Sequence, residues 1–151
     1  MIRKGKNVAI LAGGTSQERV ISLLSAEQLQ RWLSETDYKS YIIDVQGASW
    51  IYTLPDGRNL QVDKNTFSLP LPEGTLPLDM AFITTHGTPG ENGLLQGYLE
   101  LMQIPFTSGE TFTQAISFHK SACKRYLQGV VPLLPSIEIK RFEDLDIEQV
   151  V

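Results

Sequence analysis

Apolar residues in this chain gather in short runs separated by glycine-rich turns. Residues 7–12 (NVAILA) form a run without polar alternation, which is typical of a parallel strand covered on both faces. Gly13 and Gly14 end this run, a helix is expected over residues 18–34, and a second strand over residues 41–44. This order predicts a βαβ unit with a parallel sheet and a right-handed crossover. The expected buried face of the helix consists of Ile21, Leu24, Leu29, Trp32 and Leu33.

Residues 46–78 do not continue this alternation of strands and helices. The sequence PDGR at residues 55–58 is a turn signal, because proline presets φ and glycine adopts positive φ without steric cost. The segments 50–54 and 59–63 flank the turn, and together they predict a β-hairpin. We interpret residues 46–78 as an excursion from the main sheet and not as a linker between two cores.

The second half of the chain returns to buried elements. Residues 80–85 (MAFITT) predict a strand, and residues 86–93 form a glycine-rich loop. Helices are expected over residues 94–102, 110–118 and 120–128, and short strands over residues 105–107 and 137–139. The whole pattern predicts an α/β fold with a mostly parallel sheet and a hairpin insertion.

Composition and charge narrow the function classes. The 13 Lys and Arg residues against 17 Asp and Glu give a net charge of -4. Because a weakly acidic chain lacks the basic field that binds phosphate backbones, we expect no nucleic-acid partner. The single Cys123 cannot form an internal disulfide, which suits a reducing compartment. The apolar run at residues 8–12 is too short for a signal sequence or a membrane span, so we expect a cytoplasmic protein without a membrane partner.

The first candidate site is the turn GGTSQE at residues 13–18. Its glycines allow backbone to approach a ligand, but it lacks the GxGxxG spacing of dinucleotide-binding turns. Thr15 and Glu18 have the spacing of a capping box, in which both side chains would serve the helix terminus. Alternatively, a Glu18 carboxylate free of capping would lie at the carboxyl edge of the sheet and receive a substrate ammonium. The sequence leaves both interpretations open.

The second candidate site pairs His86 with Glu91. His86 follows a buried strand, where ligands of open α/β sheets bind, and Glu91 is placed to hold its imidazole in one tautomer. A structural histidine, and a Glu91 that only neutralises the next helix terminus, are equally compatible with the sequence.

A third candidate, Lys120 with Lys124, shares one helical face, which is more commonly a solvated basic surface. Zinc, serine-hydrolase and P-loop motifs are absent from the sequence, and we expect no metal ligands.

Four segments, in this order, resemble the D-alanine–D-alanine ligase family of ATP-grasp enzymes. They are residues 9–22 (AILAGGTSQERVIS), 82–100 (FITTHGTPGENGLLQGYLE), 104–107 (IPFT) and 119–124 (HKSACK). The resemblance covers nearly the whole chain except the hairpin segment, and it implies a Rossmann-like, three-layer pre-ATP-grasp domain. Asn92 and His119 depart from the aspartates usual in the family, and Val20 from a frequent second acid.

The resemblance also implies a reaction and a site. In the family, ATP phosphorylates the carboxylate of one D-alanine, and the amine of a second attacks the acyl phosphate to give a dipeptide for peptidoglycan synthesis. By similarity, Glu18 would hold the ammonium of the first D-alanine, and His86 would position that substrate with Glu91 behind it. Thr15 and Ser16 would shape the substrate loop, and Lys120 would reach toward the nucleotide.

The family resemblance further predicts the domain organisation. Residues 1–130 would form the amino-terminal domain, and residues 131–151 the start of the linker to the ATP-grasp region. That region would hold ATP and Mg²⁺, so we expect the chain alone to bind neither and to be inactive. The implied partners are D-alanine, the ATP-grasp domains of the same polypeptide and a second copy in a homodimer.

Three other functions are alternatives to the ligase. A non-catalytic ligand-binding or interaction domain stays open. The missing GxGxxG turn disfavours a dinucleotide oxidoreductase. The loop at residues 86–93 disfavours other ATP-grasp enzymes such as carboxylases. The sequence does not distinguish D-alanine, D-lactate and D-serine as the second substrate.

Overall fold

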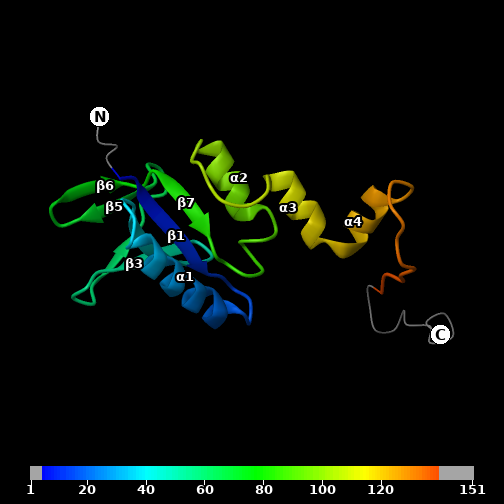
Figure 1. Ribbon diagram of the computed structural model, residues 1–151, viewed down its shortest axis with the longest axis horizontal. Helices are drawn as coiled ribbons and strands as arrows, with labels where there is room; N and C mark the ends of the chain where they lie inside the picture. The colour runs from blue at the N-terminus through cyan, green and yellow to red at the C-terminus, as the bar shows by residue number, and fades with distance from the viewer. Residues whose placement is uncertain (1–4, 140–151) are drawn as a thin grey trace.

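The molecule is built on a parallel βαβ unit, from which the later helices extend to one side (Figure 1). The computed structural model describes residues 5–139. Strand β1 (Asn7–Gly13) pairs in parallel with β2 (Lys39–Gln46) and with β7 (Met80–Ile83), and helix α1 (Arg19–Leu33) connects β1 to β2. The predicted strand, turn, helix and strand are therefore confirmed.

Strand β1 is buried on both faces, as its unbroken apolar run predicts. Ile10 and Ala12 pack on the side of α1, whereas Ala9 and Leu11 belong to the larger core on the opposite side, under α2 (Leu94–Leu101). All four side chains are fully shielded from solvent. Helix, sheet and helix thus form the three layers expected of a Rossmann-like domain.

The face by which α1 contacts the sheet differs from the predicted one. Ile21, Leu24 and Trp32 are exposed, at 54%, 55% and 62%, while Ser22 and Ala26 are fully buried. Leu29 and Leu33 pack beside Ala26, as expected. The positions 22, 26, 29 and 33 form a regular helical stripe whose first two residues are small, so a search for bulky apolar residues misplaced it.

The segment 46–78 extends the main sheet, so its interpretation as an excursion was wrong in part. Strands β3 (Ser49–Thr53) and β4 (Asn59–Gln61) form the predicted hairpin, but β3 also pairs antiparallel with β2. The sheet order is β4-β3-β2-β1-β7.

A second hairpin leaves this sheet. Strands β5 (Ser68–Leu71) and β6 (Gly74–Pro77) form a separate two-stranded sheet, which is the actual insertion. Sequence analysis did not identify these strands, because they are short and carry prolines at residues 70 and 77, which are unfavourable in strands.

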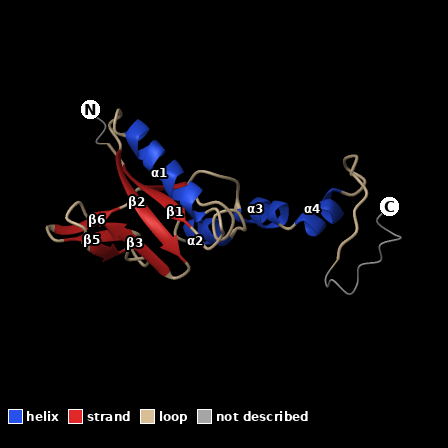
Figure 2. Cartoon of the chain, turned by 90° about the horizontal axis from the view of Figure 1, so that it is seen from below, coloured by secondary structure: helices blue, strands red, loops and turns tan. Residues whose placement is uncertain are grey.

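The last helices form an arm that projects from the sheet (Figure 2). Helices α3 (Thr111–Phe118) and α4 (Lys120–Leu127) follow α2 within a few residues of the predicted bounds. The strand expected at residues 105–107 is reduced to one bridge between Ala81 and Phe106, and the strand expected at residues 137–139 does not form. Within residues 5–139, neither sheet includes these residues. Among residues 5–139, none of the helices combines the length and hydrophobicity needed to cross a membrane.

Candidate functional site

Two loops meet at the carboxyl edge of the sheet. The β1 loop (residues 14–18) follows β1, and the β7 loop (residues 84–93) follows β7. Thr15 N donates to the carbonyl oxygen of Thr88 at 3.0 Å, and Ser16 Oγ donates to that of His86 at 2.9 Å. The loops adjoin because β1 and β7 are parallel neighbours, whose carboxyl ends share one edge.

Glycines allow this close approach. Gly14 has a φ of +94°, and a Cβ there would lie 2.7 Å from Thr85 Cγ2 and 2.9 Å from the carbonyl oxygen of Thr88. A Cβ on Gly87, whose φ is +70°, would lie 3.0 Å from Ser16 Cβ. Larger residues at either position would therefore separate the loops.

The Glu18 carboxylate is not used for helix capping. Glu18 occupies the N-cap position of α1, but its side chain makes no capping hydrogen bond, and the Thr15 hydroxyl donates to the carbonyl oxygen of Thr88 at 3.3 Å instead. The capping-box interpretation is therefore wrong. Glu18 is exposed, and within residues 5–139 its carboxylate has no hydrogen bond or ion pair. This carboxylate is available to an incoming cation.

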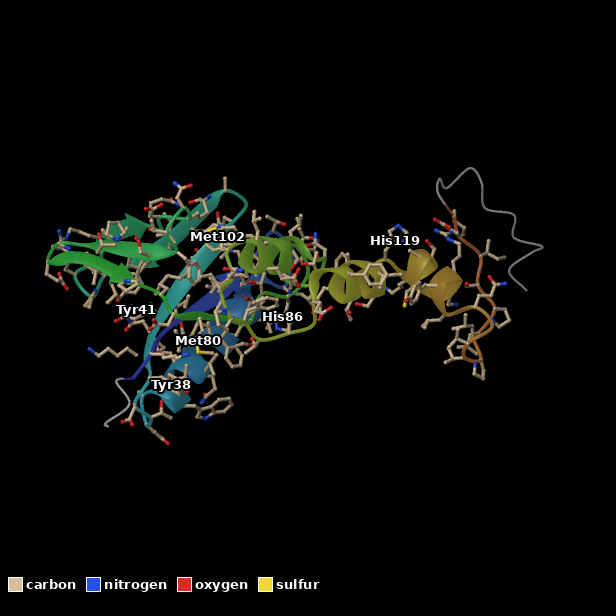
Figure 3. All side chains as sticks on the ribbon, turned by 90° about the horizontal axis from the view of Figure 1, so that it is seen from above. Tyr38, Tyr41, Met80, His86, Met102 and His119 are labelled. Carbon is tan, nitrogen blue, oxygen red and sulfur yellow. The ribbon has the colours of Figure 1, made fainter. Side chains whose placement is uncertain are left out.

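His86 lines a cavity at the end of β7. Figure 3 shows His86 beyond the sheet, on the side from which α3 projects. The cavity has a volume of about 320 Å³, and its polar lining includes Thr85, Glu91, Ser108 and Gln114. His86 is half-buried there, so its ring can meet a small polar molecule.

Glu91 supports the β7 loop and does not orient the His86 ring. Its Oε2 accepts a hydrogen bond from Gly87 N at 2.8 Å, and its own N–H donates to the carbonyl oxygen of Gly87 at 2.9 Å. The expectation that Glu91 fixes the imidazole tautomer is wrong, because this tight turn directs the carboxylate to the loop backbone. Asn92 serves the terminus of α2, since its Oδ1 accepts from Leu94 N at 3.3 Å.

The predicted residues do not all line one cavity. Thr15 lines a second cavity of about 260 Å³ together with Trp50, Thr88 and Tyr98. Glu18 and Ser16 line neither cavity. The structure thus brings the two loops into contact while the Glu18 carboxylate remains on the exposed rim.

Lys120 lies apart from these loops. It is exposed at the start of α4, on the arm, and Figure 3 places the adjacent His119 well away from His86. His119 Nδ1 accepts from Ala122 N at 3.3 Å, so this histidine caps α4. Lys124 donates to the carbonyl oxygen of Leu134 at 2.9 Å.

Sequence reasoning missed two groups that hold the β1 loop. Arg19 forms a forked ion pair with Asp44 on β2, and these hydrogen bonds raise the pKa of Arg19 above its usual range. The fully buried Ser22 accepts from Gly13 N and donates to the carbonyl oxygen of Thr84, both at 2.9 Å. In the sequence, the only indication of these contacts was Ser22, a serine among the α1 positions that face the sheet.

These features define a class before any relative is considered. A parallel α/β sheet with two joined loops at its carboxyl edge, and without the dinucleotide turn, is a Rossmann-like domain suited to a small polar ligand.

Comparison with known proteins gives the family. Residues 7–109 match the model for the D-ala D-ala ligase N-terminus. The chain is 38% identical over 147 residues to a D-alanine–D-alanine ligase of Phocaeicola vulgatus, covering 97% of this chain and 45% of that protein. It is 40% identical over 122 residues to the ligase of Porphyromonas gingivalis, covering 81% and 37%. The chain therefore belongs to the family of D-alanine–D-alanine ligase amino-terminal domains, and it spans less than half the length of these curated relatives.

Solved structures agree with this assignment. D-alanyl-alanine synthetase A from Vibrio cholerae superimposes with a TM-score of 0.74 at 29% identity, over 84% of this chain and 38% of that one. D-alanine-D-alanine ligase from Aeromonas hydrophila gives 0.77 at 27% identity, over 89% and 50%.

Proposed function

We propose that this chain is the amino-terminal, substrate-side domain of an ATP-dependent D-alanine–D-alanine ligase of peptidoglycan synthesis. It contributes to the site of the first D-alanine. The observation that carries this proposal is the Glu18 carboxylate, which has no partner within residues 5–139, on a loop that is hydrogen-bonded to the His86 loop. The family membership supplies the substrate class, since the matched relatives are D-alanine–D-alanine ligases.

Each loop residue has a role in this proposal. The Glu18 carboxylate accepts charge-assisted hydrogen bonds from the ammonium of the first D-alanine. His86 lies at the neighbouring cavity and positions the same substrate through its ring nitrogens. Thr15 and Ser16 hold the β1 loop against the β7 loop, and Glu91 keeps the β7 loop in its turn.

ATP and Mg²⁺ require other parts of a ligase. Residues 5–139 contain no cluster of three or more His, Cys, Asp or Glu side chains, so the described part of the chain does not fit a magnesium site of its own. In the proposal, residues 1–130 form the substrate-side domain, and residues 131–151 lead to the ATP-grasp domains of the same polypeptide. Lys120, exposed on the arm, reaches toward the nucleotide held by those domains.

Substitution of Glu18 in the complete ligase polypeptide tests this proposal. Glu18→Gln removes the charge and keeps the size, and we expect the KM for the first D-alanine to rise roughly 10- to 100-fold, since a hydrogen bond to a charged group contributes about 1.5–3 kcal/mol. Glu27→Gln makes the same chemical change at an exposed position of α1 and should leave that KM unchanged. An unchanged KM in Glu18→Gln would exclude Glu18 from the site.

A further inference from the structure

The position of the Glu18 side chain depends on its neighbours in the chain. Its carboxylate has no bonding partner within residues 5–139, so no contact of its own fixes it in place. Glu18 is also the last residue before α1, where the backbone leaves the loop and enters the helix. Whatever holds the residues on either side therefore determines the region that the carboxylate can reach.

The preceding side is held by the β7 loop. Ser16 Oγ donates to the carbonyl oxygen of His86 at 2.9 Å and accepts from Glu18 N at 3.2 Å. One hydroxyl thus ties the Glu18 backbone to the residue that carries the imidazole.

The following side is held by an ion pair to β2. Arg19 Nη1 donates to Asp44 Oδ1 at 2.7 Å, and Nη2 donates to the other carboxylate oxygen. The two side chains are only 29% and 33% exposed. Gln46 lies against the same guanidinium. When its amide is oriented so that both the oxygen and the nitrogen find hydrogen-bonding partners, the oxygen is 3.0 Å from Arg19 Nη1. A forked, partly buried pair of this kind fixes orientation as well as distance.

The end of β1 is shaped to receive this pair. Gly13 has a φ of +91°, and a Cβ there would lie 2.6 Å from Arg19 Nη1 and closer still to Asp44 Oδ1. The pair therefore packs directly over the glycine backbone that begins the turn. The next residue, Gly14, donates its N–H to the carbonyl oxygen of Val45 at 2.8 Å.

We propose that Arg19 and Asp44 are positioning residues of the substrate site: their ion pair fixes the first turn of α1 to the end of β2 and so sets the Glu18 carboxylate relative to His86. This rests on the proposed function for the identity of the ligand. The pair touches no substrate, and its effect on binding passes through Glu18. Loss of the pair lets the β1 loop sample other positions, which weakens ammonium binding and leaves nucleotide binding unchanged.

Amide hydrogen exchange on this chain tests the structural half of the inference. In Arg19→Gln we expect the Gly14 and Thr15 amides to exchange about fivefold faster than in the parent chain, because the β1 loop opens more often without the Arg19–Asp44 ion pair. Arg31→Gln, an exposed arginine in the last turn of the same helix, is the matched control and should leave these amides unchanged. Equal exchange in Arg19→Gln and Arg31→Gln would overturn the proposal.

Kinetics of the complete ligase polypeptide test the functional half. Arg19→Gln and Asp44→Asn should each raise the KM for the first D-alanine about fivefold, with kcat and the KM for ATP unchanged, because small displacements of a binding group weaken binding. The double variant should be no worse than either single variant, because both remove one interaction.

The two proposals fail in different ways. If Glu18→Gln raises the KM for the first D-alanine and Arg19→Gln does not, the positioning role is wrong. If Glu18→Gln leaves the KM for the first D-alanine unchanged while Arg19→Gln still accelerates amide exchange, the Arg19–Asp44 pair does hold the β1 loop and the assigned substrate site is wrong.

Discussion

Ser22 shows how one small polar residue serves both the fold and the site. It is fully buried on the sheet-facing side of α1, where a large apolar residue would be the usual choice. Its hydroxyl joins Gly13 N to the carbonyl oxygen of Thr84 and so connects the ends of β1 and β7. A bulky residue at this position would push the helix away from the two loops.

Removal of this hydroxyl should destabilise the chain. In Ser22→Ala, Gly13 N loses its acceptor in a buried place, and we expect the free energy of unfolding to fall by about 1–3 kcal/mol. Urea unfolding followed by circular dichroism measures this change. Ser25→Ala in the same helix removes a hydroxyl bonded only to the carbonyl oxygen of Ile21 and should cost less than about 0.5 kcal/mol. Equal effects of the two substitutions would contradict the assigned role of Ser22.

Among the elements, helix α2 packs on the larger core. Leu95 and Leu99 are buried against the sheet, at 3% and 0% exposure, while Leu101 is 82% exposed. The spacing of Leu95 and Leu99 places them on one helical face.

A pair of leucine substitutions tests this orientation of α2. Leu99→Ala should lower the free energy of unfolding by about 2–5 kcal/mol, because it leaves a cavity in a packed core. Leu101→Ala makes the same chemical change in solvent and should shift it by less than about 0.5 kcal/mol. Chemical denaturation of both variants is the measurement, and similar losses would mean that α2 presents a different face to the sheet.

The junction of α2 and α3 depends on a carboxylate. Glu100 accepts from Thr111 N at 2.9 Å and from Thr111 Oγ1 at 2.7 Å, and these hydrogen bonds lower the pKa of Glu100 below its usual value of 4.5. Since the N-cap residue Glu110 makes no side-chain cap, Glu100 supplies the acceptor at the start of the arm.

Acidification should therefore loosen the arm. Because the pKa of Glu100 is lower in the folded chain, its stabilising effect is complete above pH 4.5 and is lost as the pH falls through the folded pKa. We expect the Thr111 amide to exchange faster below that pH in the parent chain, after correction for intrinsic rates. Glu100→Gln should show a weaker pH dependence, and an identical dependence in both proteins would refute this assignment.

Across the whole molecule, the order of helices and strands was easier to predict from the sequence than which face of each element is buried. The βαβ unit, α2 and the arm helices follow from apolar runs and glycine turns, which are local signals. The buried face of α1 could not be predicted in this way, because Ser22 and Ala26 are small and their burial depends on contact with a distant strand.

The candidate site was predicted only in outline. The meeting of the two loops follows from parallel strands, and the hydrogen bonds between Ser16, Thr15 and the β7 loop confirm it. The partners of Glu91 and Thr15 were misassigned, because backbone acceptors brought close by folding are invisible in a sequence. Asp44 lies 25 residues from Arg19, so their pairing also required the fold.

The chain alone should not perform the ligase reaction. It spans 45% of the Phocaeicola vulgatus relative, and phosphoryl transfer depends on metal and cationic groups arranged around the nucleotide. We expect no phosphate release from ATP and Mg²⁺ in the presence of D-alanine, measured by a coupled phosphate assay. A complete ligase serves as the positive control. Turnover by this chain alone would contradict the proposal that ATP and Mg²⁺ are bound by other domains of the ligase.

In the proposed function, the β1 and β7 loops bind the first D-alanine. Titration of the isotope-labelled chain with D-alanine, followed by amide chemical shifts, tests it most directly. We predict saturable shifts in residues 14–19 and 85–88, much smaller shifts with L-alanine, and loss of the response in Glu18→Gln. Shifts confined to other parts of the chain, or equal shifts in the parent and the Glu18→Gln variant, would mean that D-alanine does not bind at these loops through Glu18.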